Sequence, residues 1–340
     1  MKIFFRAILI VFLGVLCCGC GKEEPERFEN ADVAFGTVIQ QILYTAGDGE
    51  REAEEILALL RKLEEERLSR RLADSEVSRV NRTAGAEEGC LLSPELETAV
   101  EECLEVWERS GGAFDITLGE LAALWDIDGW AAGEREGEFI PPEEESLREA
   151  LVRSGSGKLR LEDGRIFLSE GMSLDLGAVG KGIAMEEILG KLQEEENITG
   201  AIISLGGSIL TYGGKPDGTD WRVAVRDPLD GTGNAGVLSL EGQWCVSTSG
   251  DYERYAEKDG IRYHHILDPA TGYPANSGVA GVTVLSKDGF LSDALSTACF
   301  ILGPEKGIPL AESYGAEILF IKKDGSLEMS GGMRRYFSRE

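Results

Sequence analysis

Basic residues are scarce in this chain, and the shortage argues strongly against one large class of partner. Its 340 residues include 34 Lys and Arg against 61 Asp and Glu, which gives a formal net charge of −27. Nucleic acids need cationic partners for their phosphates, so we expect no nucleic-acid binding. The same balance predicts that an anionic substrate must be neutralised locally, by a metal ion or by backbone dipoles.

Paired cysteines are missing as well. Outside a cluster at 17–20 the chain has four cysteines, and none of these four belongs to a CxxC pair. Disulfides are permitted outside the cytoplasm, but these spacings do not demand them. The simplest interpretation is that the four are small buried hydrophobes: Cys90, Cys103, Cys245 and Cys299.

One apolar run of unusual length stands at the N-terminus. Two positive charges, Lys2 and Arg6, precede an apolar run at 7–16 that is too short to span a bilayer comfortably. The run ends in small residues and cysteines, a pattern typical of a signal peptide, which we place at 1–19.

The cysteine cluster that follows resembles a bacterial lipobox, with Cys20 as the predicted lipid acceptor. The match departs from the usual pattern because Cys17 replaces an aliphatic residue, and simple cleavage to a soluble secreted protein is the alternative. With lipidation, 20–31 becomes a lipidated N-terminus and tether. It would hold the protein on the extracytoplasmic face of the bacterial cell membrane.

The rest of the chain carries no Pro/Ser-rich linker and no internal repeat, so we place a single domain at 32–340. Apolar periodicity predicts helices at 52–67, 94–109, 182–193 and 293–302. It predicts strands at 173–176, 200–205, 221–226 and 281–285, and a closing hairpin of 318–322 with 327–329. The charged stretch 131–149 is predicted to be a surface insertion. Since helices and strands mix without strict alternation, we expect an α+β fold.

Asp293 and Thr297 are four residues apart on a predicted helix, so they lie on one face of it. Carboxylate and hydroxyl oxygens suit Mg²⁺, which completes its shell with waters and substrate phosphates. Asp293 is also near the predicted helix start, where a carboxylate can simply cap free N–H groups. Spacing alone leaves both roles open.

Two glycine-rich segments could approach a ligand. The run 173–182 contains Asp175 and places Lys181 just before a predicted helix, where an ammonium and free N–H groups suit a diphosphate. It lacks the Walker A spacing, and such a run is often only a turn. The segment 204–208 ends a predicted strand in two glycines, which either admit a ligand or merely end the strand.

The chain has two histidines, His264 and His265, which point to opposite faces of a predicted strand. One that faces a pocket is a candidate base, and the alternative is one exposed and one packed histidine. In the segment 111–117, Asp115 could accept hydrogen bonds from ring nitrogens. Phe114 could pack on a flat ring or belong to the apolar core.

The motifs have a specific order. They are Phe35-Gly-Thr, Asp74-Ser-Glu-Val-Ser-Arg-Val-Asn, Gly111-Gly-Ala-Phe-Asp-Ile-Thr, Asp175-Leu-Gly-Ala-Val-Gly-Lys-Gly, Leu205-Gly-Gly-Ser, Trp221-Arg-Val-Ala-Val-Arg-Asp-Pro, Val246-Ser-Thr-Ser-Gly-Asp, His265-Ile-Leu-Asp-Pro-Ala-Thr-Gly and Asp293-Ala-Leu-Ser-Thr-Ala. In this order they resemble the ApbE family of FAD:protein FMN transferases.

The resemblance implies a single T-fold-related catalytic domain with mixed helices and sheets. It also implies a Mg²⁺-dependent reaction that splits FAD at its diphosphate. FMN is joined through its phosphate to a threonine of a partner, an exported or membrane-bound electron-transfer protein, and AMP leaves. The rivals are a Mg²⁺-dependent FAD pyrophosphatase and, in another class, a non-catalytic flavin-binding lipoprotein.

The resemblance also assigns site residues. Asp293, Thr297 and the backbone carbonyl of Ala178 would hold the metal, and His265 and Asp293 would be catalytic, with His265 as the base. Residues expected to contact FAD are Phe35, Arg71, Ala113, Phe114, Asp115, Asp175, Lys181 and His265. Two positions depart from the family: Phe35 replaces a methionine, and Arg71 stands where many relatives have an aromatic residue over the flavin.

Overall fold

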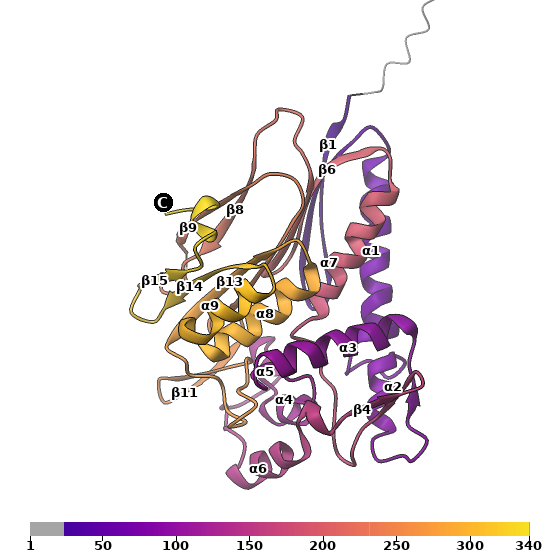
Figure 1. The fold of residues 1–340 in the computed structure, drawn as a ribbon, viewed down its shortest axis with the longest axis vertical. Helices are drawn as coiled ribbons and strands as arrows, with labels where there is room; N and C mark the ends of the chain where they lie inside the picture. Colours follow the sequence, from indigo (N-terminus) through magenta and orange to yellow (C-terminus); the bar gives the residue numbers. More distant parts are fainter. Residues whose placement is uncertain (1–23, 231, 340) are drawn as a thin grey trace, which may run out of the picture.

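The fold is built on an eight-stranded antiparallel sheet in which every strand pair is antiparallel (Figure 1). The computed structural model describes residues 24–230 and 232–339. In spatial order the strands are β1 (Glu26–Ala34), β2 (Thr37–Thr45), β6 (Ile198–Leu205), β7 (Ser208–Gly213), β10 (Trp244–Gly250), β13 (Val279–Ser286), β14 (Glu317–Lys322) and β15 (Leu327–Met329).

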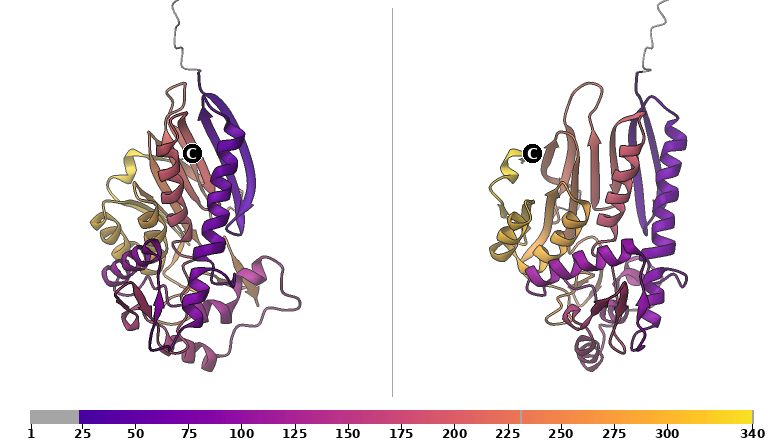
Figure 2. Two further views of the ribbon diagram at one scale, coloured as in Figure 1. Left: turned by 90° about the vertical axis from the view of Figure 1, so that its right-hand side faces the viewer. Right: turned by 45° about the vertical axis from the view of Figure 1, so that its right-hand side comes forward.

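Helices cover one face of this sheet, and Figure 2 shows two of them running along it. They are α1 (Gly49–Leu63), which continues as the π-helix η1 (Glu64–Leu68), α7 (Gly180–Glu194), α8 (Gly289–Leu302) and α9 (Pro304–Ser313). Alternate residues of the strands point to this side, as Ile318 and Phe320 of β14 do.

A small sheet covers the other face. It consists of β16 (Phe337–Ser338), β9 (Asn234–Leu240) and β8 (Trp221–Arg226), with the 3-10 helix η3 (Met333–Arg335) beside it. Val223 and Val225 pack against Leu319 and Ile321, the alternate residues of β14. Because both faces of the central sheet are covered, β13 is buried over its whole length.

The remaining elements form the lower part of the molecule in Figure 1. Its helices are α2 (Glu76–Arg82), α3 (Pro94–Arg109), α4 (Gly119–Trp125), α5 (Ile127–Ala131), α6 (Glu144–Arg153) and the 3-10 helix η2 (Ser156–Lys158). Its strands are β3 (Cys90–Leu91), β4 (Arg160–Glu162), β5 (Arg165–Phe167), β11 (Tyr255–Lys258) and β12 (Ile261–His264). One continuous core includes residues of both this part and the sheet. Helices and antiparallel sheets mix without strict alternation, so the α+β prediction is confirmed.

Most predicted elements are present, several with their predicted ends. The helix at 94–109 and the strand at 221–226 have the predicted bounds, and Ser93 caps the helix by accepting from the Leu96 N–H. The predicted hairpin is β14–β15. All four cysteines outside the N-terminal cluster are free and buried, as expected.

Three expectations need correction. The strand at 173–176 is wrong, since only Ser173 forms an isolated bridge, with Leu118. The helix expected to begin at Asp293 begins at Gly289, because Asp288 is its N-cap. The predicted tether at 20–31 overlaps β1, so its last residues already belong to the sheet.

The stretch 131–149 is only partly a surface insertion. Its first part lacks regular structure, but Phe139 is buried in an aromatic cluster with Trp125, Trp130 and Tyr263. The signal peptide, Cys20 and the start of the tether lie outside the described residues. Within 24–230 and 232–339, no helix is long and apolar enough to cross a membrane.

Helices α7 and α8 meet at two glycines. A Cβ on Gly182 would lie 2.6 Å from the Gly289 carbonyl oxygen, and one on Gly289 would lie 2.7 Å from the Gly182 carbonyl oxygen. Since backbone atoms cannot yield as side chains do, only glycine permits this approach.

We predict that Gly182→Ala forces the two helices apart and lowers the free energy of unfolding by about 1–3 kcal/mol, the usual cost of overpacking. Gly190→Ala on the same helix is the matched control, since no atom lies within 4 Å of its added Cβ. The control should be stabilised by roughly 0.5–1 kcal/mol through helix propensity. Urea unfolding measures both, and equal effects of the two substitutions would contradict the predicted close packing.

Candidate active site

A cavity of about 790 Å³ lies where the central sheet meets the lower part of the molecule. Its walls include the loops after β1 and η1, the turn before α7, and residues from α8, β8, β10 and the loop before β11. Every residue predicted for the site lines it: Phe35, Arg71, Ala113, Phe114, Asp115, Asp175, Ala178, Lys181, His265, Asp293 and Thr297. Their individual roles remain predictions, but the structure brings them together.

Asp293 does not cap its own helix, because the N-cap of α8 is Asp288. It lies in the second turn of α8, is 3% exposed, and its Oδ2 accepts the Gly182 N–H at 2.9 Å. Its Oδ1 is 3.5 Å from Lys181 Nζ and 3.4 Å from Ser208 Oγ. Both contacts are long, so Oδ1 keeps capacity for a further partner.

Thr297 follows Asp293 by one turn and also lines the cavity. Among the residues that the structure describes, its hydroxyl has no hydrogen-bond partner. Ala178 lies in the turn that leads into α7, beside Lys181. Asp293, Thr297 and Ala178 therefore line one cavity. Their carboxylate, hydroxyl and backbone carbonyl are all hard oxygen donors.

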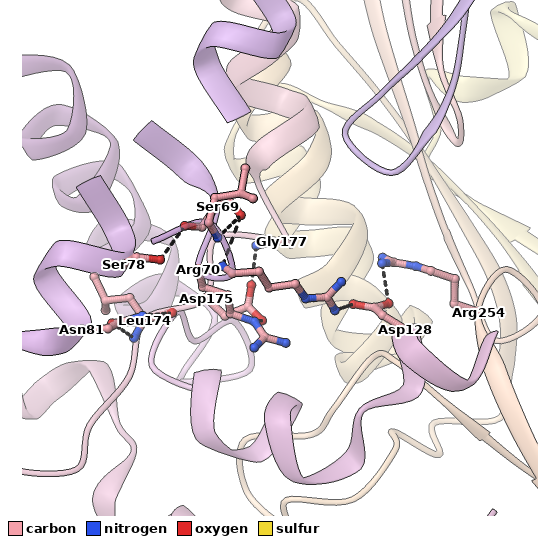
Figure 3. Close-up of polar contacts among 11 residues, drawn as sticks. Ser69, Arg70, Ser78, Asn81, Asp128, Leu174, Asp175, Gly177 and Arg254 are labelled. Carbon is pink, nitrogen blue, oxygen red and sulfur yellow. Dashed lines mark hydrogen bonds and ion pairs between the residues drawn. The ribbon is translucent and has the colours of Figure 1, made fainter. Parts of the chain in front are cut away.

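The turn before α7 is held by the Asn81 side chain and by backbone bonds to 116–119 rather than by a named strand. Asn81 binds both backbone groups of Leu174, donating to its carbonyl at 3.0 Å and accepting from its N–H at 2.7 Å (Figure 3). The Asp175 N–H donates to the Ile116 carbonyl at 2.8 Å. These bonds replace the strand partner that the wrong prediction at 173–176 required.

The Asp175 carboxylate already has protein partners. Its Oδ1 accepts the Gly177 N–H at 2.8 Å, and its Oδ2 accepts Arg70 Nε at 2.7 Å (Figure 3). The sequence reasoning missed Arg70, because no local pattern signals a pair separated by more than a hundred residues.

Asp115 and Phe114 are strongly tied to their own loop and core. The Asp115 carboxylate accepts bonds from Thr117 N and Oγ1 and from Ser156 N and Oγ, at 2.6–3.0 Å. Phe114 is 1% exposed and belongs to the main core. Its position thus favours the core alternative, although it borders the cavity.

The two histidines differ in surroundings. His264 is buried, and its Nε2 lies 3.0 Å from the Ala275 carbonyl. Burial lowers its pKa to about 4. His265 lines the cavity, with Nδ1 3.2 Å from the Arg254 carbonyl. Loss of solvation, together with the charge of Arg254, holds the pKa of its imidazole well below the usual range.

Arg71 is engaged in an ion pair rather than free above the cavity. Its guanidinium lies 2.6 Å from Asp128, whose other oxygen lies 2.6 Å from Arg254. Phe35 stands in the left-handed region at φ 54°, and its N–H donates to Glu64 at 2.8 Å.

The sequence reasoning also missed cavity residues that directly follow the motif ending at Asp251. They are Tyr252, Glu253 and Arg254. Burial raises the pKa of Glu253 and moves that of Tyr252 far above its usual range. Their adjacency to a recognised motif was the one signal that could have marked them.

Charge is balanced within the cavity although the chain is strongly acidic. Of the described residues that line it, five are cationic and six are carboxylates. A large cavity lined by a lysine, a buried carboxylate and a histidine suits the binding of an anionic ligand and group transfer or hydrolysis on it.

Comparison with known proteins identifies the family. The model of the ApbE family matches residues 35–320. The FAD:protein FMN transferase of Treponema pallidum is 33% identical, over 96% of this chain and 92% of that protein. Its counterpart from Vibrio cholerae is 30% identical, over 96% and 98%. This chain belongs to the ApbE family.

Solved structures agree with this membership. The ApbE protein of Thermotoga maritima superposes with a TM-score of 0.82 at 31% identity, over 93% of this chain and 100% of that one. The flavin transferase ApbE of Vibrio cholerae gives 0.80 at 28% identity, over 92% and 99%. The ApbE-like fold expected from the motifs is confirmed.

We predict that His264 makes the protein less stable at mildly acid pH. Its folded-state pKa of about 4 lies below the ordinary value of 6.5, so the unfolded chain binds the proton first as pH falls. The stability is present above pH 6.5 and is lost as pH falls toward 4. It falls by roughly 2 kcal/mol between pH 7 and pH 5.

The comparison is with His264→Gln, which cannot titrate but can still donate to the Ala275 carbonyl. Urea unfolding at each pH measures the stability of both proteins. The titration of His265 contributes equally to both, so it cancels when the two stabilities are subtracted. Wild type should lose more stability than the variant over this range. If the free energies of unfolding of the two proteins ran parallel with pH, the pKa of His264 would not be lowered in the folded state.

Proposed function

We propose that this protein is an FAD:protein FMN transferase that joins FMN to a threonine of an exported partner protein. The observation that carries the proposal is the group Asp293, Lys181 and Thr297 in one cavity with His265. Lys181 is 3.5 Å from Asp293, and His265 lines the same cavity. Groups for binding a diphosphate and for accepting a proton are therefore neighbours.

The oxygen donors in the cavity fit Mg²⁺. Within 24–230 and 232–339, no group of three or more His, Cys, Asp or Glu side chains could hold a metal. Asp293, Thr297 and the Ala178 carbonyl offer a sparse set, which suits an ion that keeps waters and shares substrate phosphates. Bound there, Mg²⁺ would neutralise diphosphate charge and stabilise the leaving AMP.

The residues of the chain supply position and charge for the transfer. Phosphoryl transfer depends on these more than on covalent help from the protein. Lys181 lies in the first turn of α7, where its ammonium and the helix N-terminus both favour a diphosphate. In the step, the threonine oxygen bonds to the FMN phosphorus as the bond from that phosphorus to AMP breaks.

His265 accepts the threonine proton in this reaction. Its lowered pKa keeps the imidazole neutral at physiological pH, so a lone pair is available throughout. The same lowering makes it a weak base. Proton transfer therefore accompanies the formation of the phosphoester bond rather than preceding it.

Incubation with FAD, Mg²⁺ and a candidate acceptor tests the function. We expect the acceptor to gain FMN on a threonine, seen by mass spectrometry, with release of AMP. Free FMN beside an unmodified acceptor would instead indicate a pyrophosphatase. Flavin that is bound but unchanged would indicate a non-catalytic binder.

Asp293→Asn is the sharpest variant for this assay, because the amide oxygen can still accept the Gly182 N–H. Transfer should fall by about 10²–10³-fold, the usual loss when one preorganised electrostatic group is removed. Asp288→Asn is the matched control on the same helix. Asn also caps helices, and Asp288 does not line the cavity. Equal activity of the two variants would refute the metal assignment.

We propose further that Cys20 anchors the protein to the membrane by a lipid. The cavity lies at the Phe35 end of β1, and the chain enters this strand at Glu26. Nine residues of strand span roughly 30 Å. An anchor at Cys20 thus leaves the cavity away from the tether and accessible to an acceptor.

Cys20→Ser tests the anchor. We expect the variant to move from the membrane fraction to the soluble extracytoplasmic fraction, while Cys17→Ser stays with the membrane. Immunoblots of the two fractions measure this. Membrane attachment of the Cys20 variant would refute Cys20 as the acceptor.

A further inference from the structure

One carboxylate at the cavity joins two segments that are far apart in sequence. Asp128, in the first turn of α5, lies 2.6 Å from Arg71 through one oxygen. Its other oxygen lies 2.6 Å from Arg254 (Figure 3). All three side chains belong to residues that line the cavity. The loop after η1 and the loop before β11 are thereby held to the same helix.

Arg254 also contacts the candidate base through its backbone. In the hairpin of β11 and β12, Tyr255 is paired with His264, so the next residues outward, Arg254 and His265, face each other. The Arg254 carbonyl accepts the His265 N–H at 3.2 Å and lies 3.2 Å from His265 Nδ1. A chain of contacts thus runs from Asp128 through Arg254 to the imidazole.

This contact fixes the tautomer of His265. A carbonyl oxygen can only accept, so the proton of the neutral ring must be on Nδ1 and the lone pair on Nε2. Within the described part of the chain, His265 Nε2 has no hydrogen-bond partner. The opposite holds for His264: its Nε2 faces the Ala275 carbonyl, and its Nδ1 has no partner among the described residues.

We propose that Asp128 is a positioning residue for the transfer reaction: by holding Arg254, it keeps His265 in the Nδ1–H tautomer with Nε2 free to accept the threonine proton. This inference rests on the proposed function for its kinetic part, since only a reaction that deprotonates a hydroxyl needs the base. The structural part, the tautomer, is independent of any substrate.

Asp128 can be changed without endangering the fold. Its side chain is 28% exposed, and those of Arg71 and Arg254 are 53% and 44% exposed. Ion pairs so open to solvent contribute little to stability. An effect of Asp128→Asn on His265 therefore reflects a change in the position of Arg254 and not unfolding of the protein. The thermal unfolding midpoint should stay close to that of wild type.

The test is nitrogen NMR of protein labelled with ¹⁵N-histidine and carrying no polyhistidine tag. The sequence contains two histidines, so the spectrum reports on His264 and His265 alone. In wild type at neutral pH we expect two opposite neutral tautomers. In Asp128→Asn we expect His265 to become a mixture of tautomers, while His264 stays unchanged as an internal reference.

Two controls separate the contacts. Arg71→Gln removes one arm but leaves the pair of Asp128 with Arg254, so the His265 tautomer should remain as in wild type. Asp126→Asn removes a carboxylate that is paired with Arg135 and does not line the cavity. Asn tolerates the left-handed backbone of Asp126, at φ 43°. This variant should match wild type in every measurement.

Kinetics complete the test. Asp128→Asn should lower kcat for FMN transfer by about tenfold, since general-base catalysis contributes about 10²–10⁴-fold and a mobile base retains part of it. Asp128→Glu, which restores the charge, should recover part of the rate. An unchanged tautomer and an unchanged kcat in Asp128→Asn would overturn the inference. Absence of transfer by wild type would instead refute the proposed function and leave the tautomer result standing.

Discussion

The hydrogen bond from the Gly182 N–H to Asp293 joins the two halves of the cavity. It can form at 2.9 Å only because two glycines let α7 and α8 approach to backbone contact. The same contact brings Lys181 to Asp293, and Ala178 and Thr297 line the cavity beside them. Packing of one helix pair therefore places Asp293 and Thr297 of α8 against the start of α7.

The polar side chains of the cavity fall into two groups: some hold its walls in place, and others are free to bind a ligand. Asp115 has four protein donors and Asp175 has two, so both carboxylates mainly hold loops in place. Asp293 and Thr297 instead keep unused hydrogen-bonding capacity at the cavity surface. A site of this kind is preorganised, because the carboxylates that hold its loops are already hydrogen-bonded and other polar groups are left free for a ligand.

Sequence reasoning predicted the elements whose signals are local. The cap at Ser93 and the alternation in 221–226 placed both elements with their final bounds. It failed at 173–176, where the long-range partner is the side chain of Asn81 rather than a strand. The pairs of Arg70 with Asp175 and Arg254 with Asp128 leave no periodic trace in the sequence. The residues recognised by motif lie around one cavity, whereas the ion-paired residues that hold them there were found only in the structure.

Because the chain is strongly acidic, the ion pairs at the cavity affect how an anionic ligand can bind. An anionic ligand approaches a molecule of net charge −27, yet the cavity lining is close to neutral because arginines and a lysine offset its carboxylates. Asp128 contributes twice to this arrangement: it holds two arginines at the cavity and, in the proposed role, keeps His265 in its Nδ1–H tautomer through Arg254. The positive charge left on Arg254 also helps to keep the imidazole neutral. The charge of Arg254 thus serves both the attraction of the ligand and, after the larger effect of burial, the neutral state of the base.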